Sequence, residues 1–248
     1  MKEDTTDFGF TKVKLEEKRK LVSKVFDSVA DSYDIMNDLM SLGVHRLWKR
    51  HAIALAQVRP NMQILDLAAG TGDLSALMAS ILKNSGHITL CDINMSMLQH
   101  AKMRLIDQGF VENISIAQAN AEHLPFENNV FDRITIGFGL RNVTFKEKAL
   151  ASMYRVLKPG GRMTILEFSH PTNSAFSKLY DTYSFHVLPK IGEWVAKDGA
   201  SYQYLAESIR MHPNQDRLKE MVLEAGFDKC DYHNLTGGIV AIHQGVKY

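Results

Sequence analysis

The sequence has few of the residues that signal a metal site or a disulfide framework. Its two cysteines, Cys91 and Cys230, lie far apart and match no metal-binding or redox spacing. We therefore predict that both are buried, reduced thiols in a reducing compartment. Ten histidines are present, yet none belongs to an HExxH pattern or another zinc signature. We expect no bound metal.

The chain also lacks an excess of charge of one sign and long apolar runs. It carries 29 Lys and Arg residues against 28 Asp and Glu residues, which excludes the strong basic field that nucleic-acid binding usually requires. Residues 1–10 are acidic and polar, unlike a signal peptide, and no apolar run approaches the ~18 residues of a membrane span. We expect a cytoplasmic protein with no nucleic-acid partner.

The first quarter of the chain is dominated by a helical pattern. Apolar residues between Leu21 and Tyr33 recur at the spacing of one helical face. Residues 38–50 predict a second, shorter amphipathic helix, interrupted at Gly43. We interpret residues 1–60 as an N-terminal helical cap.

Strand and helix patterns alternate from residue 61 onward, which favours an α/β fold with a parallel sheet covered on both faces. The predicted strands are 63–67, 87–91, 114–117, 133–137 and 162–168, and the predicted helices are 74–82, 94–108 and 146–157. Residues 61–168 would form the cofactor-binding core, 169–212 an inserted helical segment for the substrate, and 213–248 a helix and edge strands. In that last part we expect a helix at 216–225 capped by Gly226, and two strands joined by a longer connection. The whole chain, 1–248, would be one domain.

A glycine turn follows the first core strand, in the sequence DLAAGTGD from Asp66 to Asp73. Gly70 and Gly72 can adopt backbone angles closed to other residues and admit a ligand close to the main chain. Ser75 occupies the third glycine position of the dinucleotide fingerprint, which weakens a pyrophosphate-binding interpretation. Asp92 ends the second strand, where such folds place an acid that accepts hydrogen bonds from ribose hydroxyls. The alternative is ordinary loop chemistry with no ligand.

These residues resemble the class I S-adenosylmethionine-dependent methyltransferases, which combine an acid and a glycine turn with a second acid after strand two. The stretches NAEHLPF (120–126) and LKPGGR (157–162) match two further landmarks of that superfamily. The resemblance implies a Rossmann-like fold with a mainly parallel seven-stranded sheet flanked by helices, and S-adenosylmethionine as the cofactor.

A closer resemblance covers nearly the whole chain. Four blocks, at 24–50, 137–143 (GFGLRNV), 184–192 (SFHVLPKIG) and 201–215, are similar to the ubiquinone/menaquinone biosynthesis C-methyltransferase (UbiE) family. This resemblance implies methylation of a ring carbon of a polyprenyl hydroquinone, demethylmenaquinol in one pathway and 2-polyprenyl-6-methoxy-1,4-benzoquinol in the other. The residues assigned to the cofactor are Asp66, Gly70, Thr71, Gly72, Asp92, Asn120, Ala121 and Gly137. At Gly137 the family has a serine, so a hydroxyl contact is absent here.

Arg141 and Asn142 are the candidate catalytic residues, because they follow strand 133–137 at the carboxyl edge of the sheet. A phenol with a pKa near 10 is mostly protonated at pH 7, and its ionisation would cost about 4 kcal/mol. We expect Arg141 to stabilise the developing oxyanion and Asn142 to orient a water or hydroxyl, while water or a nearby acid accepts the proton. The alternatives are a surface salt bridge for Arg141 and a helix cap for Asn142.

Aromatic residues suggest where the lipid substrate could bind. Tyr33, Tyr183 and His186 are candidate substrate residues, although Tyr33 also fits the buried stripe of the N-terminal helix. The aromatic insertion that contains Tyr183 and His186 could form a tunnel for the isoprenoid tail, a surface that meets the bilayer, or ordinary core. His186 and His170 are candidate proton acceptors on pKa grounds alone. The predicted partner is a lipid quinol, with a peripheral membrane contact, a quinone-biosynthesis complex or a homodimer as further expectations. A methyltransferase of another small phenolic substrate and a non-catalytic scaffold are the competing functions.

Overall fold

The computed structural model describes residues 5–29, 38, 41, 43–83, 85–173, 180, 185, 193 and 199–248 of the chain. Three residues singled out from the sequence lie outside the described residues: Tyr33, Tyr183 and His186.

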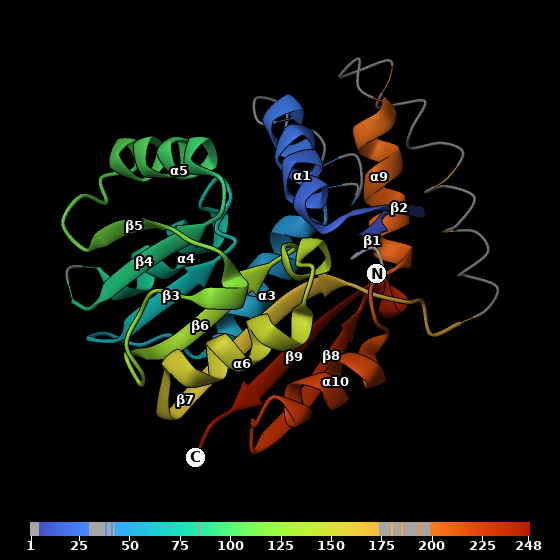
Figure 1. The fold of residues 1–248 in the computed structure, drawn as a ribbon. Helices are drawn as coiled ribbons and strands as arrows, with labels where there is room; N and C mark the ends of the chain where they lie inside the picture. Colours follow the sequence, from blue (N-terminus) through green and yellow to red (C-terminus); the bar gives the residue numbers. More distant parts are fainter. Residues whose placement is uncertain are drawn as a thin grey trace.

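A seven-stranded, mainly parallel sheet organises the core, as predicted (Figure 1). Its strands in spatial order are β5 (Ile114–Gln118), β4 (His87–Asp92), β3 (Gln63–Leu67), β6 (Phe131–Gly137), β7 (Leu157–Phe168), β9 (Val240–Val246) and β8 (Lys229–Leu235). The first five strands pair in parallel, whereas β9 pairs antiparallel with both β7 and β8. The predicted parallel core therefore ends in an antiparallel edge.

Helices cover both faces of the sheet because its central strands bury side chains on both sides. One face carries α3 (His45–Ala56), α4 (Asp73–Leu82) and α5 (Met95–Asp107), and the other carries α6 (Lys146–Val156) and α10 (Gln215–Glu224). Figure 1 shows α6 and α10 in front of the sheet, with α3 and α4 behind it. Ile64 and Leu65 of β3 point to opposite faces, and both are fully buried.

The connections after β3 and β6 create the crevice in which ligands bind in this architecture. These strands are neighbours in the sheet, yet the helix after β3, α4, packs on one face and the helix after β6, α6, packs on the other. The two loops therefore diverge at the carboxyl ends of the strands. This is the topological switch point of an open α/β sheet.

The N-terminal part differs from the predicted helical cap. A hairpin of β1 (Thr5–Phe8) and β2 (Thr11–Lys14) precedes helix α1 (Leu15–Val29). Its four-residue strands are polar and mostly exposed, so they carry no hydrophobic alternation that the sequence could reveal. Helix α3 begins only at His45, because the chain turns at Gly43, whose φ is +77°.

The late strands also differ from the prediction. We expected a longer connection, but β8 and β9 are joined by a single short 3-10 turn, Thr236–Gly238. Gly237 and Gly238 both have positive φ angles, which allow the tight reversal. The helix before them ends at Glu224, and Gly226 follows with a φ of +107°, as its predicted capping role requires.

Helix α9 (Gly199–Arg210) stands beside α1 at the carboxyl edge of the sheet (Figure 1). The N-terminal hairpin packs against it. The ring of Phe8 stacks on Tyr204 with centroids 4.1 Å apart, and the Phe10 N–H donates to Glu207 Oε2 at 3.0 Å. Segments from the two ends of the chain thus form one structure above the switch point.

Candidate active site

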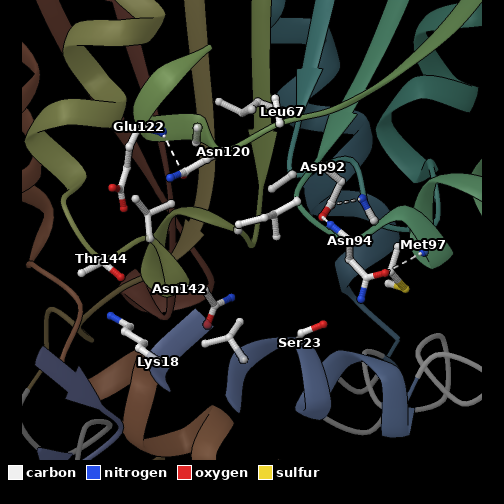
Figure 2. A pocket seen from close by; sticks show the side chains of 18 of the residues that line it. Lys18, Ser23, Leu67, Asp92, Asn94, Met97, Asn120, Glu122, Asn142 and Thr144 are labelled. Carbon is white, nitrogen blue, oxygen red and sulfur yellow. Dashed lines mark hydrogen bonds between the residues drawn. The ribbon is translucent and has the colours of Figure 1, made fainter. Parts of the chain in front are cut away.

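A cavity of about 550 Å³ lies at the switch point, between the loops of the sheet and helix α1. Figure 2 shows its side chains in two groups. The Asp92 end contains Gly70, Asp92, Asn94 and Met97, and the Asn142 end contains Lys18, Asn142, Thr144 and Phe145. Its volume and its largely apolar walls with a few polar groups are typical of small-molecule sites.

The glycine turn forms the floor of the Asp92 end. Gly70 and Gly72 have φ angles of +54° and +81°, which glycine adopts without strain. Gly70 lines the cavity, whereas a side chain at Gly72 would come within 3.1 Å of the Ala101 Cβ on α5. Gly70 therefore leaves room for a ligand, and Gly72 lets the turn pack against α5.

Asp66 lies behind the turn rather than in the cavity. Its carboxylate is 1% exposed and accepts hydrogen bonds from the hydroxyls of Ser75 at 2.6 Å and Thr135 at 2.8 Å. Burial raises the pKa of Asp66 to about 6, although these hydroxyls act in the opposite direction. Ser75, which departs from the dinucleotide fingerprint, thus fixes the acid that begins the turn.

Asp92 lines the cavity at the carboxyl end of β4. Its Oδ2 accepts from the Gly70 N–H and its Oδ1 from the Asn94 N–H, each at 2.9 Å (Figure 2). Burial raises the pKa of this carboxyl, while those backbone donors act against the shift. Each carboxylate oxygen can accept more than one bond, so both retain capacity for ligand hydroxyls. The geometry suits the two hydroxyls of a ribose.

Asn120 and Ala121 form another wall of the cavity. The Asn120 side chain accepts from the Glu122 N–H at 3.1 Å and so caps the 3-10 turn Ala121–His123. Beside them lie the apolar side chains of Leu67, Ile93 and Ala119. Apolar side chains next to a polar amide suit an adenine ring, so the residues present fit S-adenosylmethionine.

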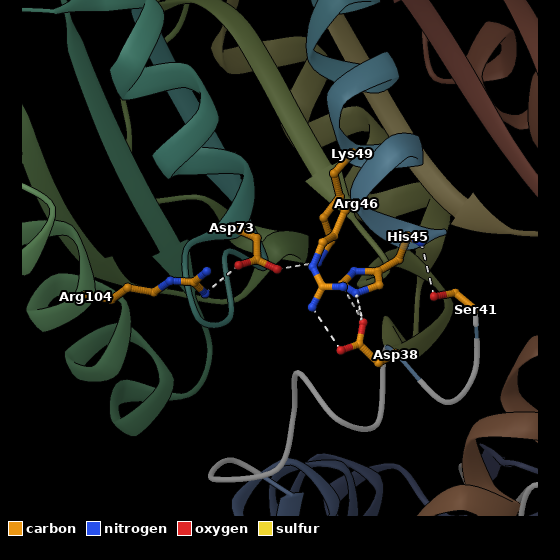
Figure 3. Close-up of polar contacts among 7 residues, drawn as sticks. All are labelled: Asp38, Ser41, His45, Arg46, Lys49, Asp73 and Arg104. Carbon is orange, nitrogen blue, oxygen red and sulfur yellow. Dashed lines mark hydrogen bonds and ion pairs between the residues drawn. The ribbon is translucent and has the colours of Figure 1, made fainter. Parts of the chain in front are cut away.

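An ion-pair network anchors the glycine turn from outside the cavity (Figure 3). Asp73, the first residue of α4, pairs with Lys49 of α3 and, at 2.5 Å, with Arg104 of α5. Burial alone would raise the pKa of Asp73, but the two cations outweigh it and hold that pKa below its usual value. A carboxylate also stabilises a helix N-terminus. Three helices thereby hold the turn in place.

The break in the strand β6 sequence, GFG, lies at the centre of the cavity. Gly137 and Gly139 both line it, and Phe138 between them has a φ of +57° with its ring buried against Trp48 and Phe168. A side chain at Gly139 would overlap the Ala68 Cβ of the neighbouring loop. Glycine is therefore required where the loops after β3 and β6 touch.

Arg141 does not reach the cavity. Its side chain is 3% exposed, its Nη1 pairs with Glu167 Oε1 at 2.9 Å, and its guanidinium lies 5.5 Å from the Phe168 ring. Its own N–H also donates to Glu167 Oε2 at 3.1 Å. The structure places Arg141 behind the cavity wall, in a buried ion pair rather than the surface salt bridge we considered.

Asn142 does line the cavity, and Tyr204 fixes the direction of its amide. The Tyr204 hydroxyl donates to Asn142 Oδ1 at 3.0 Å, and burial raises the pKa of that phenol to about 12, so it keeps its proton. The Asn142 Nδ2 is buried and has no hydrogen-bond partner among the described residues. The wall of the cavity therefore contains an amide donor that no described residue uses.

Sequence reasoning missed the contribution of helix α1. Lys18, Val22 and Ser23 line the cavity opposite the loops of the sheet. Helix α1 contains several lysines in an amphipathic pattern, and nothing in the sequence distinguishes Lys18 from the others as a residue that lines a cavity. His170, a candidate proton acceptor, lies elsewhere, because its Nε2 bonds the His212 carbonyl at 2.9 Å and it does not line the cavity.

Among the described residues, no group of three or more His, Cys, Asp or Glu side chains could hold a metal ion. No helix within the described ranges is long and apolar enough to cross a bilayer.

Solved structures share the fold of this chain. A S-adenosylmethionine-dependent methyltransferase from Thermotoga maritima, described as a possible histamine N-methyltransferase, aligns with a TM-score of 0.64 at 16% identity, over 91% of this chain and 99% of that one. A methyltransferase from Aquifex aeolicus aligns with a TM-score of 0.61 at 14% identity, over 86% and 96%. Both confirm the predicted Rossmann-like methyltransferase fold.

Closer similarity appears in sequence. The ubiquinone/menaquinone biosynthesis C-methyltransferase of Klebsiella pneumoniae (strain 342) is 59% identical over 246 residues, which cover 99% of this chain and 98% of the relative. The protein of the same name from Psychromonas ingrahamii is also 59% identical over the same shares. The model of the ubiE/COQ5 methyltransferase family matches residues 12–247. S-adenosylmethionine-dependent methyl transfer, predicted from the motifs, is thereby confirmed, and the chain belongs to the ubiE/COQ5 methyltransferase family.

Proposed function

We propose that this enzyme methylates a ring carbon of a polyprenyl hydroquinone, converting demethylmenaquinol to menaquinol and 2-polyprenyl-6-methoxy-1,4-benzoquinol to its methylated product. The names of relatives 59% identical over almost the full chain support this substrate class. The observation that carries it here is the Asn142 Nδ2, which has no hydrogen-bond partner among the described residues, in the wall of a largely apolar cavity whose other end suits the cofactor. A hydroquinone offers the matching oxygen on a flat, apolar ring.

The Asp92 end of the cavity would bind the cofactor, and the Asn142 end would bind the quinol. S-adenosylmethionine, when bound, supplies an electrophilic methyl group. Asp92 would hold the ribose hydroxyls, Asn120 and Ala121 would border the adenine, and Gly70 and Gly137 would let the ligand approach the backbone. Asp66, Thr71 and Gly72 are absent from the lining and would act by shaping the turn.

Asn142 would donate a hydrogen bond to a ring oxygen and so orient the carbon that attacks the methyl group. Alignment of this kind can contribute roughly 7 to 11 kcal/mol to a bimolecular reaction. Arg141 would act indirectly: its ion pair with Glu167 fixes the 3-10 turn Leu140–Asn142 from behind. We therefore propose Arg141 as a positioning residue, in place of the direct oxyanion contact expected from the sequence.

An anaerobic assay tests the proposal. The enzyme is incubated with S-adenosylmethionine carrying a 13C-labelled methyl group and a short-chain demethylmenaquinol, and the product is examined by mass spectrometry and 13C NMR. We expect a product heavier by one labelled methyl on a ring carbon. Label on oxygen, or transfer only to small phenols without a prenyl tail, would overturn it in favour of the phenolic alternative. Calorimetric titration that detects no S-adenosylmethionine binding would favour a scaffold.

The remaining expectations stay predictions: a peripheral membrane contact, a quinone-biosynthesis complex, a homodimer, and substrate roles for Tyr33, Tyr183 and His186. Vesicle co-sedimentation and analytical ultracentrifugation would measure the membrane contact and the oligomeric state.

A further inference from the structure

Lys18 of helix α1 is a buried cation at the Asn142 end of the cavity. The residue is 6% exposed and lines the cavity. Figure 2 shows its amino end on the side where Asn142, Thr144 and Glu122 lie, away from Asp92 and Asn94. No hydrogen bond or ion pair joins its amine to another of the described residues, whereas buried lysines are ordinarily paired.

The charges around Lys18 come from three other elements and do not neutralise it. Asp7 of β1 and Glu122 of the turn Ala121–His123 favour its charged form, and Lys146 of α6 opposes it. Lys146 is itself committed, because its amine donates to the Val143 carbonyl at 3.1 Å. Burial, followed by the repulsion from Lys146, lowers the pKa of Lys18 to about 8. A free amine is therefore accessible near neutral pH.

Two groups at the Asn142 end have the hydrogen-bonding character that a phenolic hydroxyl requires. Asn142 Nδ2 can only donate, and it lacks a partner among the described residues. The Lys18 amine, once deprotonated, can accept. Of the histidines weighed from the sequence, His170 does not line the cavity, and His186 lies outside the described residues.

We propose that Lys18 is a catalytic residue that accepts the proton of the quinol hydroxyl while the neighbouring ring carbon attacks the methyl group. The inference rests on the proposed function and deepens it. As the carbon–carbon bond forms, the methyl–sulfur bond breaks and its electron pair leaves with the sulfur. The O–H bond breaks at the same time, its electron pair makes the ring ketone, and its proton joins the Lys18 amine.

The second half of the reaction restores the aromatic ring. The hydrogen on the methylated carbon leaves as a proton to water, and the Lys18 ammonium returns its proton to the ring oxygen. One proton is released overall, and the Lys18 amine is regenerated. Arginine at this position could donate hydrogen bonds but could not accept the proton, because its pKa is above about 12.

The variants Lys18→Arg and Lys18→Met test whether Lys18 accepts a proton or only binds the substrate through its positive charge. Lys18→Arg keeps the charge but cannot accept the proton, and Lys18→Met removes both. We expect kcat to fall on the order of 100-fold in both, since general-base catalysis typically contributes 100- to 10,000-fold. The wild-type kcat should rise about tenfold per pH unit up to about pH 8, and this inflection should vanish in both variants. Lys24→Met, an exposed lysine of the same helix, is the control with unchanged kinetics.

A measurement without turnover completes the test. A short-chain hydroquinone is bound anaerobically to enzyme saturated with S-adenosylhomocysteine, and both affinities are measured by calorimetry. We expect the affinities for S-adenosylhomocysteine and for the hydroquinone to be unchanged in both Lys18 variants, so that the fall in kcat reports the chemical step and not binding. A Lys18→Arg enzyme that keeps wild-type kcat and pH profile, or Lys18 variants whose lower activity follows from weaker hydroquinone binding alone, would overturn the inference. Wild-type enzyme that methylates no quinol would instead overturn the proposed function.

Discussion

The two ends of the cavity are built in different ways. At the Asp92 end, short loops after β3 and β4 supply the groups, and backbone N–H donors from Gly70 and Asn94 hold the carboxylate. At the Asn142 end, the groups are side chains from α1, α9 and the loop after β6, which are far apart in the chain. The first end depends on local turn geometry and the second on tertiary packing, so substitutions should affect them through different quantities.

Breaking the buried ion pair between Arg141 and Glu167, which supports the Asn142 end, should have the largest effect on the free energy of unfolding. Arg141→Met leaves Glu167 buried without its cation, and loss of one partner of a buried pair costs about 3–5 kcal/mol. Urea unfolding should show a loss of this size. The double variant Arg141→Met/Glu167→Gln should be less destabilised than the sum of the two single variants. Additive losses would show that the pair is not coupled.

Asp66, which supports the glycine turn at the Asp92 end, should make the free energy of unfolding depend on pH. The pKa of Asp66 is about 6 in the fold against a usual value near 3.9, so the unfolded chain releases this proton first as pH rises. This contribution to stability is complete below about pH 4 and is lost by about pH 6. Relative to Asp66→Asn, the wild-type free energy of unfolding should fall by roughly 2 kcal/mol between pH 4 and pH 7. A stability difference between wild type and Asp66→Asn that does not change with pH would contradict the raised pKa of Asp66.

A substitution within the Asp92 end should weaken cofactor binding without disturbing chemistry at the other end. Asp92→Asn loses the charge and one acceptor, and hydrogen bonds to charged groups contribute about 1.5–3 kcal/mol each. S-adenosylmethionine affinity measured by calorimetry should fall on the order of 100-fold. The exposed Asp107→Asn on α5 is the matched control. Equal S-adenosylmethionine affinities in the two variants would show that Asp92 does not bind the cofactor.

The smallest change concerns a single hydroxyl at the Asn142 end. Tyr204→Phe removes the donor that directs the Asn142 amide, a hydrogen bond of about 1 kcal/mol. We expect kcat to fall about fivefold while S-adenosylmethionine affinity stays the same. Tyr232→Phe, whose hydroxyl donates to Asp216 on the surface, is the control. A fall in cofactor affinity instead would mean that the two ends do not act separately.

The same contrast explains what could be predicted from the sequence. The glycine turn and Asp92 were predictable, because glycine spacing and an acid at a strand end determine local geometry. Arg141 was placed at the correct edge of the sheet, but its position in the chain did not show that its side chain points away from the cavity and pairs with Glu167. Lys18 was missed because only the packing of α1 over the loops buries it. The β1–β2 hairpin was missed because its strands are polar.

The contact between the N-terminal hairpin and α9 has a consequence for biosynthesis. The hydrogen bond from Phe10 to Glu207 joins residues 197 positions apart, so β1 and β2 emerge from the ribosome long before α9 does. Contacts of such long range form late, because the cost of closing the loop precedes their benefit. A nascent chain stopped before Gly199 therefore lacks the helix on which its hairpin rests. The Asn142 end is completed only after helix α9, which carries Tyr204, has been synthesised.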